Sequence, residues 1–273
     1  MTDRTGEPAT GWPTLDAEIT VDRSAGEVNA LWDRFEVFEA MHHSQHLCNP
    51  LTEFEFDATV AAMGFDADHR VLDVACGPGE FLIRAHEAGV IGSLGVDLSP
   101  WMLQTAAGRA RTRLAGTSRP NWLLADAAKL VPRRFDRVVC LGAEWVWHGM
   151  TGTVAALAER VEVGGRVAYG GPRLHFDADV ASTTASFGRL ETADDVERRM
   201  RACGLRVRDR IDPGEPGWRA YLERGRYDAE TWARRHPGPR ADRWLADQAE
   251  WETRYEAERE IVGWSVWVAD RVA

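Results

Sequence analysis

The sequence lacks the cysteine pattern of a disulfide framework or of a structural zinc site. Its four cysteines, Cys48, Cys76, Cys140 and Cys203, are scattered, and no two of them form a Cys-x-x-Cys pair. Small secreted scaffolds and zinc sites need closely and regularly spaced cysteines. We therefore predict reduced thiols, a cytoplasmic protein and no bound metal.

Long apolar runs and an excess of positive charge are also missing. A membrane helix needs about 20 consecutive apolar residues, and a signal peptide needs a basic region followed by an apolar one; the chain has neither. Asp and Glu number 43 against 33 Lys and Arg, which gives a formal net charge of −10. Nucleic-acid-binding domains normally carry a basic patch. We therefore expect neither a membrane nor a nucleic acid as partner.

What the sequence does contain is a strand, a glycine turn and the start of a helix in direct succession. Residues 71–75 form a short apolar run, typical of a buried parallel strand. The turn Gly77-Pro78-Gly79 follows, and a helical pattern then runs to Gly89. Glycines let the backbone approach a ligand, and a helix N-terminus offers unpaired N–H groups. A lone Gly-x-Gly would still be read as an ordinary tight turn.

Two acidic residues favour a ligand site over an ordinary turn. Asp73 lies inside the predicted strand, where an unpaired polar group costs about 1–3 kcal/mol. Asp97 ends a second strand, less than twenty residues after Gly79, where a carboxylate can accept hydrogen bonds from ribose hydroxyls. The third glycine of a dinucleotide fingerprint is absent, since Phe81-Leu82 occupies that region. The pattern predicts a site for a nucleoside without a pyrophosphate.

These residues resemble the first two motifs of the class I S-adenosylmethionine-dependent methyltransferases. The resemblance extends from about residue 68 to residue 211 and returns at the C-terminus. The family usually has glycine where this chain has Ala75. An acid at the end of the third strand, here Asp126, bonds the adenine amino group in that family, and the next backbone N–H bonds the ring. The resemblance implies S-adenosyl-L-methionine as cofactor, bound by Asp73, Ala75, Gly77, Gly79, Asp97, Leu98, Asp126, Ala127 and Leu141.

Alternating strand and helix patterns predict an α/β fold with helices on both faces of the sheet. With the resemblance, we expect a Rossmann-like, seven-stranded, mostly parallel sheet whose last strand, 263–269, is antiparallel. We divide the chain into residues 1–66, a polar tail and a helical lid, and residues 67–273, the methyltransferase domain. A helical insert at about 212–260 precedes the last strand.

The predicted lid combines two helices with a histidine-rich segment. Ser24 and Glu27 form a capping box before an apolar stripe that runs to Phe35, and a second helix covers residues 52–63. Between them lie His42, His43 and His46. Without carboxylate or cysteine partners at ligand spacing, a metal site is disfavoured. N-terminal helices commonly close the active site in the resembling family, so the resemblance implies that this segment covers the cofactor.

The aromatic residues of the insert allow two interpretations. Trp244, Trp251 and Tyr255 lie on one stripe of a predicted long helix. Such a stripe most often packs a helix onto its neighbours. Alternatively, Trp218, Tyr221 and Trp251 wall an apolar substrate pocket.

Methyl transfer needs a nucleophile held in line with the methyl group, and a base only where the nucleophile carries a proton. The segment after the fourth strand should border the methyl group. We therefore assign His148 as the candidate base and Glu144 as the residue that orients it or the substrate. His148 is otherwise a surface histidine, and His42, His43 and His46 are the rival bases.

The sequence as a whole predicts a methyltransferase that acts on an O, N or C centre of a small molecule, as a monomer or homodimer. The alternative is an S-adenosylmethionine-binding protein with non-methylating chemistry or a sensor role. A dinucleotide-dependent oxidoreductase is disfavoured by the missing third glycine.

Overall fold

The computed structural model describes residues 15–22, 41–175, 183–184 and 186–272. Within them, one mixed sheet of eight strands runs in the order β1-β4-β3-β2-β5-β6-β10-β9. The first six strands in this order pair in parallel, and β10 is antiparallel to both β6 and β9. The strands are β1 (Ile19–Val21), β2 (Arg70–Val74), β3 (Gly92–Asp97), β4 (Asn121–Leu124), β5 (Phe135–Leu141), β6 (Val161–Leu174), β9 (Leu205–Ile211) and β10 (Val262–Arg271).

The strand order reverses between β2 and β5, which places the topological switch point there. From β2 the chain moves outward through β3 and β4, then returns to β5 on the other side of β2. Ligands of open α/β sheets bind at such a point, beyond the carboxyl ends of the strands. The loops after β2 and β5 are therefore the expected centre of the site.

The predicted count of seven strands is wrong by one. The eighth, β1, lies at the edge of the sheet and pairs with β4, Ile19 opposite Trp122. It falls in the region expected to be a loosely ordered tail. Three residues are too few to show a period-two pattern, and only Ile19 among them is buried. Two contacts just before β1 hold this strand in place. Asp16 N–H donates to Gln104 Oε1 over 2.7 Å, and Glu18 forms an ion pair with Arg119.

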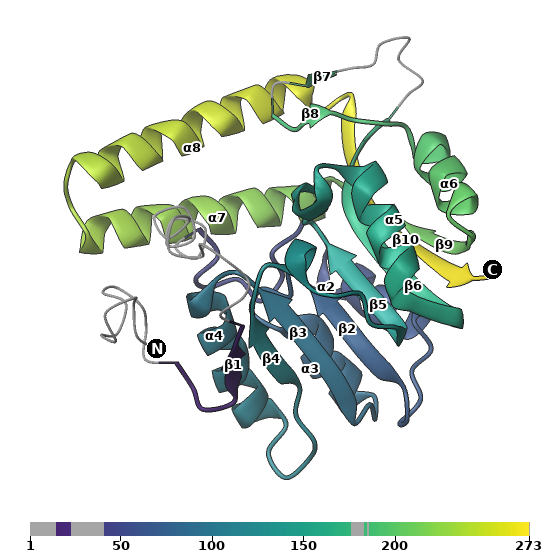
Figure 1. The fold of residues 1–273 in the computed structure, drawn as a ribbon. Coiled ribbons are helices and arrows are strands. Elements are labelled where there is room, and N and C mark those ends of the chain that lie inside the picture. Colours follow the sequence, from purple (N-terminus) through teal and green to yellow (C-terminus); the bar gives the residue numbers. More distant parts are fainter. Residues whose placement is uncertain (1–14, 23–40, 176–182, 185, 273) are drawn as a thin grey trace.

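Helices cover both faces of the sheet (Figure 1). Each face has its own apolar core, one shared with α2, α3 and α4, the other with α5 and α6. These helices are α2 (Glu53–Ala62), α3 (Glu80–Glu87), α4 (Pro100–Arg113), α5 (Met150–Arg160) and α6 (Ala193–Ala202). Residue type and spacing in the sequence predict N-caps at Ser99 and Thr192 and a helix that starts at Thr52. Thr52 and Thr192 form capping boxes with Glu55 and Asp195, and Ser99 caps α4.

The insert before the last strand forms two long antiparallel helices, α7 (Glu215–Arg235) and α8 (Pro239–Glu258). They lie side by side across one end of the sheet (Figure 1). Strand β6 continues to Leu174 because it pairs with β10 along its length. A short hairpin of β7 (Thr183–Thr184) and β8 (Gly188–Arg189) follows. The first predicted lid helix, 24–35, lies outside the described residues.

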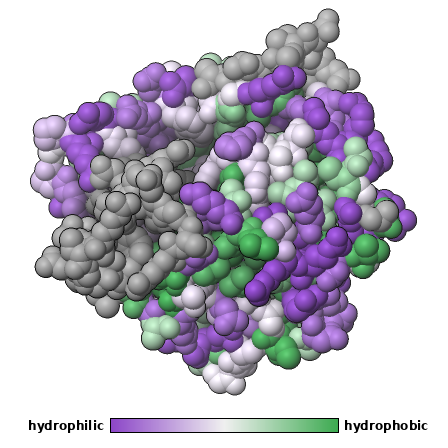
Figure 2. Space-filling view, in the orientation of Figure 1, coloured by the Kyte–Doolittle hydropathy of each residue, from purple (hydrophilic) through white to green (hydrophobic). Residues whose placement is uncertain are grey.

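The visible outer face of the molecule is largely hydrophilic, with apolar side chains in small groups between polar ones (Figure 2). No helix in the described part of the chain combines the length and apolarity needed to span a bilayer.

Candidate functional site

The loop after β2 turns through an unusual run of left-handed backbone. Ala75, Gly77 and Gly79 have φ angles of 55°, 52° and 77°. Glycine adopts this conformation freely, whereas a residue with a Cβ is strained by about 1–2 kcal/mol. Ala75 carries that strain at the position where the resembling family has glycine. The loop therefore keeps a costly shape, as is typical of binding sites.

The two glycines of the turn have different surroundings. Gly77 is partly exposed, and a Cβ placed on it would lie 3.9 Å from Cys48 Sγ. Gly79 is buried, and its Cβ would lie only 2.5 Å from the indole of Trp122 and 2.8 Å from Ala106. Gly95 in β3 is equally close to Trp122, at 2.6 Å. Gly77 therefore faces the site, and Gly79 lets α3 approach the buried Trp122.

Asp97 at the end of β3 connects two backbone segments. Its Oδ2 accepts a hydrogen bond from Gly77 N–H, and its Oδ1 accepts one from Ser99 N–H, both over 2.8 Å. Desolvation raises the pKa of this half-buried carboxyl, and the hydrogen bonds from Ser99, Gly77 and Leu98 oppose that rise. Each oxygen retains a free lone pair, so the carboxylate can also accept bonds from a pair of hydroxyls.

Asp73 is buried to 4 % exposure and lacks a protein partner. No side-chain hydrogen bond or ion pair of its carboxylate occurs among the described residues. Burial raises its pKa well above the ordinary value, and the nearby Asp97 raises it further. Asp73 lines a cavity of about 50 Å³, together with Ala75, Gly77 and Leu141. A cationic group of a ligand placed there would supply the missing partner.

That cavity holds a few water molecules, so it fits the charged end of a ligand rather than a whole nucleoside. Its other wall is the segment 46–49, which includes Cys48. An ammonium or sulfonium group beside Asp73 and a ribose beside Asp97 suit S-adenosylmethionine, which carries both. The residues present therefore fit the cofactor that the sequence implies.

The remaining predicted cofactor residues follow neighbouring strands. Asp126 comes directly after β4, and its Oδ1 accepts a hydrogen bond from Ala128 N–H over 3.0 Å. Ala127 is buried in the first turn of that short 3₁₀ helix, and Leu98 follows Asp97. Asp126 is thus a helix cap, and its Oδ2 lies 3.6 Å from Lys129 Nζ in an ion pair that a ligand would have to share or displace. Contacts of these residues with a cofactor stay predictions.

Glu80, the first residue of α3, is the centre of an ion-pair cluster. It is 3 % exposed and pairs with Arg84, Arg109 and Arg113. Burial raises its pKa, but these arginines outweigh that effect and hold it below the ordinary value. Arg109 Nη1 also donates to the Pro78 carbonyl over 3.0 Å. The cluster fixes the glycine turn to α3 and α4; only the arginine spacing on α4 signalled it in the sequence.

The histidine-rich segment, residues 41–50, packs against α7, and we call it the strap. A Cβ on Gly217 would lie 2.1 Å from the Pro50 carbonyl oxygen, and one on Gly225 would lie 3.7 Å from Gln45 Nε2. The buried Asp228 accepts a hydrogen bond from Ser44 N–H over 2.9 Å. The strap therefore lies between the helical insert and the glycine turn, as a cover of the site requires.

The strap histidines do not gather at one point. His46 forms an ion pair with Glu53, and His42 Nε2 is 3.2 Å from the Tyr221 hydroxyl on α7. Within the described residues, no cluster of three or more His, Cys, Asp or Glu side chains is arranged to hold a metal.

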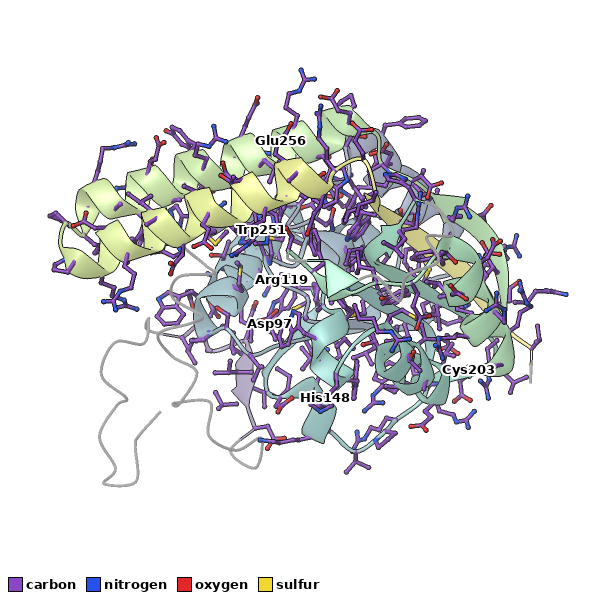
Figure 3. The ribbon with its side chains drawn as sticks, turned by 90° about the horizontal axis from the view of Figure 1, so that it is seen from above. Asp97, Arg119, His148, Cys203, Trp251 and Glu256 are labelled. Atoms are coloured by element: carbon purple, nitrogen blue, oxygen red, sulfur yellow. The ribbon has the colours of Figure 1, made fainter. Side chains whose placement is uncertain are left out.

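The two candidate catalytic residues flank a short 3₁₀ helix, η4 (Glu144–Trp147). Glu144 is half-buried, and desolvation raises its pKa. It lies close enough to Tyr169 and Tyr221 to raise the pKa of both phenols. His148 is exposed and left-handed, with φ 60°. In the view of Figure 3 it lies further from the helical insert than Asp97 does. The structure therefore half-buries Glu144 at the start of η4 and leaves His148 exposed at its end.

Comparisons with known proteins agree with this geometry. Residues 71–165 match the family model described as "Methyltransferase domain". The uncharacterized protein YjhP of Escherichia coli K12 is 28 % identical over 211 residues, which are 72 % of this chain and 79 % of YjhP.

Two solved structures share the fold. A SAM-dependent methyltransferase from Geobacter sulfurreducens, in complex with S-adenosyl-L-homocysteine, superimposes with a TM-score of 0.76 at 23 % identity, over 86 % of this chain and 98 % of that one. The [4+2]-cyclase SpnF has a TM-score of 0.63 at 22 % identity, over 80 % of each chain. Residues 71–165 therefore match a methyltransferase domain, and the two solved structures show that the chain shares their fold.

Proposed function

We propose that this methyltransferase moves the methyl group of S-adenosylmethionine to an O, N or C centre of a small molecule. The observation that carries the proposal is the unpartnered, buried Asp73 beside the left-handed loop and Asp97. Such a site suits a ligand with a cationic end and a ribose. Asp73 would face the cationic end, Asp97 the ribose hydroxyls, and Asp126 and the Ala127 N–H the adenine.

The bound cofactor supplies an activated methyl group, and the chain's residues do the positioning. Transfer requires the acceptor atom in line with the methyl group and about 3 Å from it, with water excluded. The strap covers the site on the side of Gly77 and Leu141. The helical insert holds the strap through Asp228 and Gly217. The small-molecule acceptor then enters beside Glu144 and Tyr221.

For acceptors that carry a proton, Glu144 and His148 remain our candidates for the catalytic base. A carboxyl with a raised pKa is a better base near neutral pH than an ordinary one. The exposed His148 would need to turn toward the acceptor. If His148→Ala keeps the turnover number within about twofold across pH 6–8 while Glu144→Gln loses tenfold or more, Glu144 alone is the base.

The direct test is formation of S-adenosylhomocysteine. Purified protein is incubated with S-adenosylmethionine carrying a labelled methyl group and with a small-molecule extract of the producing cells. We expect label in an extract compound together with protein-dependent S-adenosylhomocysteine. Asp97→Ala, as the inactive control, should abolish both. Labelled product at the level of the protein-free sample would contradict the proposal.

One alternative has a specific observation in its favour. The [4+2]-cyclase that shares this fold is named for chemistry other than methylation. An S-adenosylmethionine-binding protein with non-methylating chemistry, or a sensor, would bind the cofactor and leave it unchanged. Cofactor binding without S-adenosylhomocysteine formation would favour this reading.

Two further expectations accompany the proposal. The four cysteines are free thiols, which supports a cytoplasmic location. We also expect a monomer or homodimer, which the sedimentation velocity of the purified protein would distinguish.

A further inference from the structure

A second, larger cavity lies between the helical insert and the strap. Its volume is about 570 Å³, within the usual range for sites that bind small molecules. Most of its lining is apolar or aromatic: Met41, Tyr221, Leu222, Trp244 and Trp251, with His42 at the strap side. We call it the hairpin cavity.

Trp251 gives this cavity a flat aromatic wall. Its ring is stacked on Tyr255, with centroids 5.7 Å apart and planes only 6° from parallel. Phe187 also packs edge-to-face with Trp251, with ring centroids 5.8 Å apart, so only the part of the indole that neither Tyr255 nor Phe187 covers borders the cavity. Aromatic rings pair with an indole by offset or edge-to-face contact. Each such pair stabilises a complex by about 0.5–1.5 kcal/mol beyond the effect of the area it buries. A planar aromatic ligand would extend this stack.

Tyr221 places a polar group in the same lining. Its hydroxyl is 3.2 Å from His42 Nε2, and the two rings lie 5.8 Å apart. A hydroxyl has one donor and two acceptor positions, so one bond to histidine leaves room for another partner. Tyr221 can thus hold a second hydroxyl, that of a ligand.

The Tyr221 end of the cavity is also the end nearest the cofactor loop. Tyr221 contacts the strap at His42, and the same strap continues to Cys48, which borders the small cavity that contains Asp73 and Gly77. Burial, with the charges of Cys48 and Glu144, also raises the pKa of the Tyr221 phenol. A ligand hydroxyl bound by Tyr221 therefore lies on the side where the methyl group is expected.

Arg254 supplies a donor at another point of the lining. Its Nη1 donates to Glu250 over 2.7 Å, while its shielded Nε–H has no hydrogen-bond acceptor. The Arg254 side chain as a whole is 40 % exposed. An oxygen acceptor on a bound ligand, such as a carbonyl, would therefore meet the exposed part of the guanidinium group in the cavity lining.

We propose that the hairpin cavity binds a planar aromatic acceptor with a ring hydroxyl and a carbonyl oxygen, stacked on Trp251, its hydroxyl held by Tyr221. This inference rests on the proposed function and names the substrate class of the same enzyme. It makes the hydroxyl oxygen the methylated atom. Tyr221 and Trp251 then serve acceptor binding, and neither is needed to bind the cofactor.

The probe for this site is 7-hydroxycoumarin, which has a planar ring system, a ring hydroxyl and a carbonyl oxygen. Coumarin, which lacks the hydroxyl, is the matched ligand. Binding of each is measured by equilibrium dialysis to protein saturated with S-adenosylhomocysteine. We expect 7-hydroxycoumarin to bind about tenfold tighter than coumarin, the ratio that one hydrogen bond supplies. Equal affinities, or no binding of either, would overturn the proposal.

Variants identify where the probe binds. Trp251→Leu should weaken 7-hydroxycoumarin about tenfold, and Tyr221→Phe should remove its advantage over coumarin. Tyr227→Phe, the same change at an exposed position of the same helix, should have no effect. Unchanged binding in Trp251→Leu and Tyr221→Phe would place the probe elsewhere and overturn the inference.

Calorimetry of S-adenosylhomocysteine with the same variants separates this inference from the proposed function. If Tyr221→Phe binds S-adenosylhomocysteine as the wild type does, and the wild type fails to bind 7-hydroxycoumarin, only the substrate class is wrong. If the wild type binds no S-adenosylhomocysteine, the cofactor assignment itself fails.

Discussion

Asp73 is buried and Asp97 half-buried beside the same backbone turn, and desolvation raises the pKa of both carboxyls. At Asp97, hydrogen bonds from two backbone N–H groups offset part of the cost of desolvating the carboxylate. Asp73 has no such compensation in the described structure. A group of this kind destabilises the ligand-free fold at neutral pH and stabilises a complex with a cation. This trade between stability and binding is expected at a functional site.

We predict that Asp73→Asn stabilises the ligand-free protein and weakens cofactor binding. The carboxyl's folded pKa is raised, so the native state binds its proton more tightly than the unfolded state does. Wild-type stability therefore falls, relative to the Asn variant, as pH rises above the unfolded pKa near 4. At pH 8 the variant should be more stable by about 1–3 kcal/mol. Urea unfolding measured from pH 4 to pH 8 gives the difference.

The affinity of Asp73→Asn for S-adenosylmethionine is the control for this stability prediction. Asp73→Asn should bind S-adenosylmethionine at least tenfold more weakly by calorimetry, since it loses a charge-assisted contact. A variant less stable than wild type at pH 8, or one with unchanged affinity, would show that Asp73 has a structural partner instead.

Gly79→Ala should destabilise the fold by more than its backbone angle alone explains. Its φ of 77° is matched by Gly116 at 82°, but only Gly79 would place a Cβ 2.5 Å from Trp122. Gly116→Ala, with nothing within 4 Å, should cost about 1 kcal/mol. Gly79→Ala should cost about 1–3 kcal/mol more because of overpacking. Thermal unfolding of both variants tests this, and equal costs would mean that Trp122 yields without penalty.

At this scale the sequence predicts residues whose role follows from the local motif. Asp73, Gly77 and Asp97 are recognisable from a strand, a glycine turn and the next strand end. Tyr221 and Glu80 are not, because their partners lie on other elements far along the chain. Tyr221 meets His42 across 179 positions, and Glu80 meets Arg113 across 33. Pairing over such distances depends on packing that periodicity does not encode.

Among the elements, α7 is fitted to the strap by two glycines with different roles. Gly217 has no room for a Cβ beside the Pro50 carbonyl, whereas Gly225 has 3.7 Å to its nearest neighbour. Gly217→Ala should therefore displace the strap from α7. Because the strap also borders the Asp73 cavity, we expect at least fivefold weaker S-adenosylhomocysteine binding by calorimetry.

Gly225→Ala is the matched control on the same helix. It replaces glycine by the best helix former without a clash, so it should raise stability by about 0.5–1 kcal/mol and leave affinity unchanged. Equal affinity in the two variants would show that the contact between Gly217 and Pro50 is unimportant for the site.

Glu80 joins three helices, since its partner Arg84 on α3 also pairs with Glu53 and Asp57 on α2. Glu80→Gln leaves three arginines around a buried amide. Removing one partner of a buried ion pair typically costs about 3–5 kcal/mol, and the partial exposure of Arg113 places the expected loss at the lower end. Glu87→Gln, whose side chain is 41 % exposed, should cost less than about 1 kcal/mol. The urea unfolding midpoints of Glu80→Gln and Glu87→Gln measure these two losses of stability.

Elements with local signals were predictable, and those defined by pairing were not. The caps at Thr52, Ser99 and Thr192 followed from residue type and spacing alone. The edge strand Ile19–Val21 exists because β4 offers it a partner, and β6 extends to Leu174 because β10 does. Neither extension leaves a pattern in its own residues.

In the whole molecule, one sheet brings the loops after β2, β3 and β5 together, and the helical insert adds a second cavity beside them. The family fold was predictable because its motifs lie within residues 71–97. The acceptor side that we propose was not, because it is built from the strap and the insert, which meet only in three dimensions (Figure 1). The proposed cofactor half of the site is thus local in sequence, and the proposed acceptor half is not.

We propose above all that Asp97 and the glycine turn bind S-adenosylmethionine. Calorimetric titration of S-adenosylhomocysteine into the wild type, Asp97→Ala and the exposed-site control Asp209→Ala tests this binding. We predict micromolar binding in the wild type and in the control, and a loss of tenfold or more in Asp97→Ala, which corresponds to about 1.4 kcal/mol of ribose contacts. No binding to the wild type, or equal binding by all three proteins, would contradict the account.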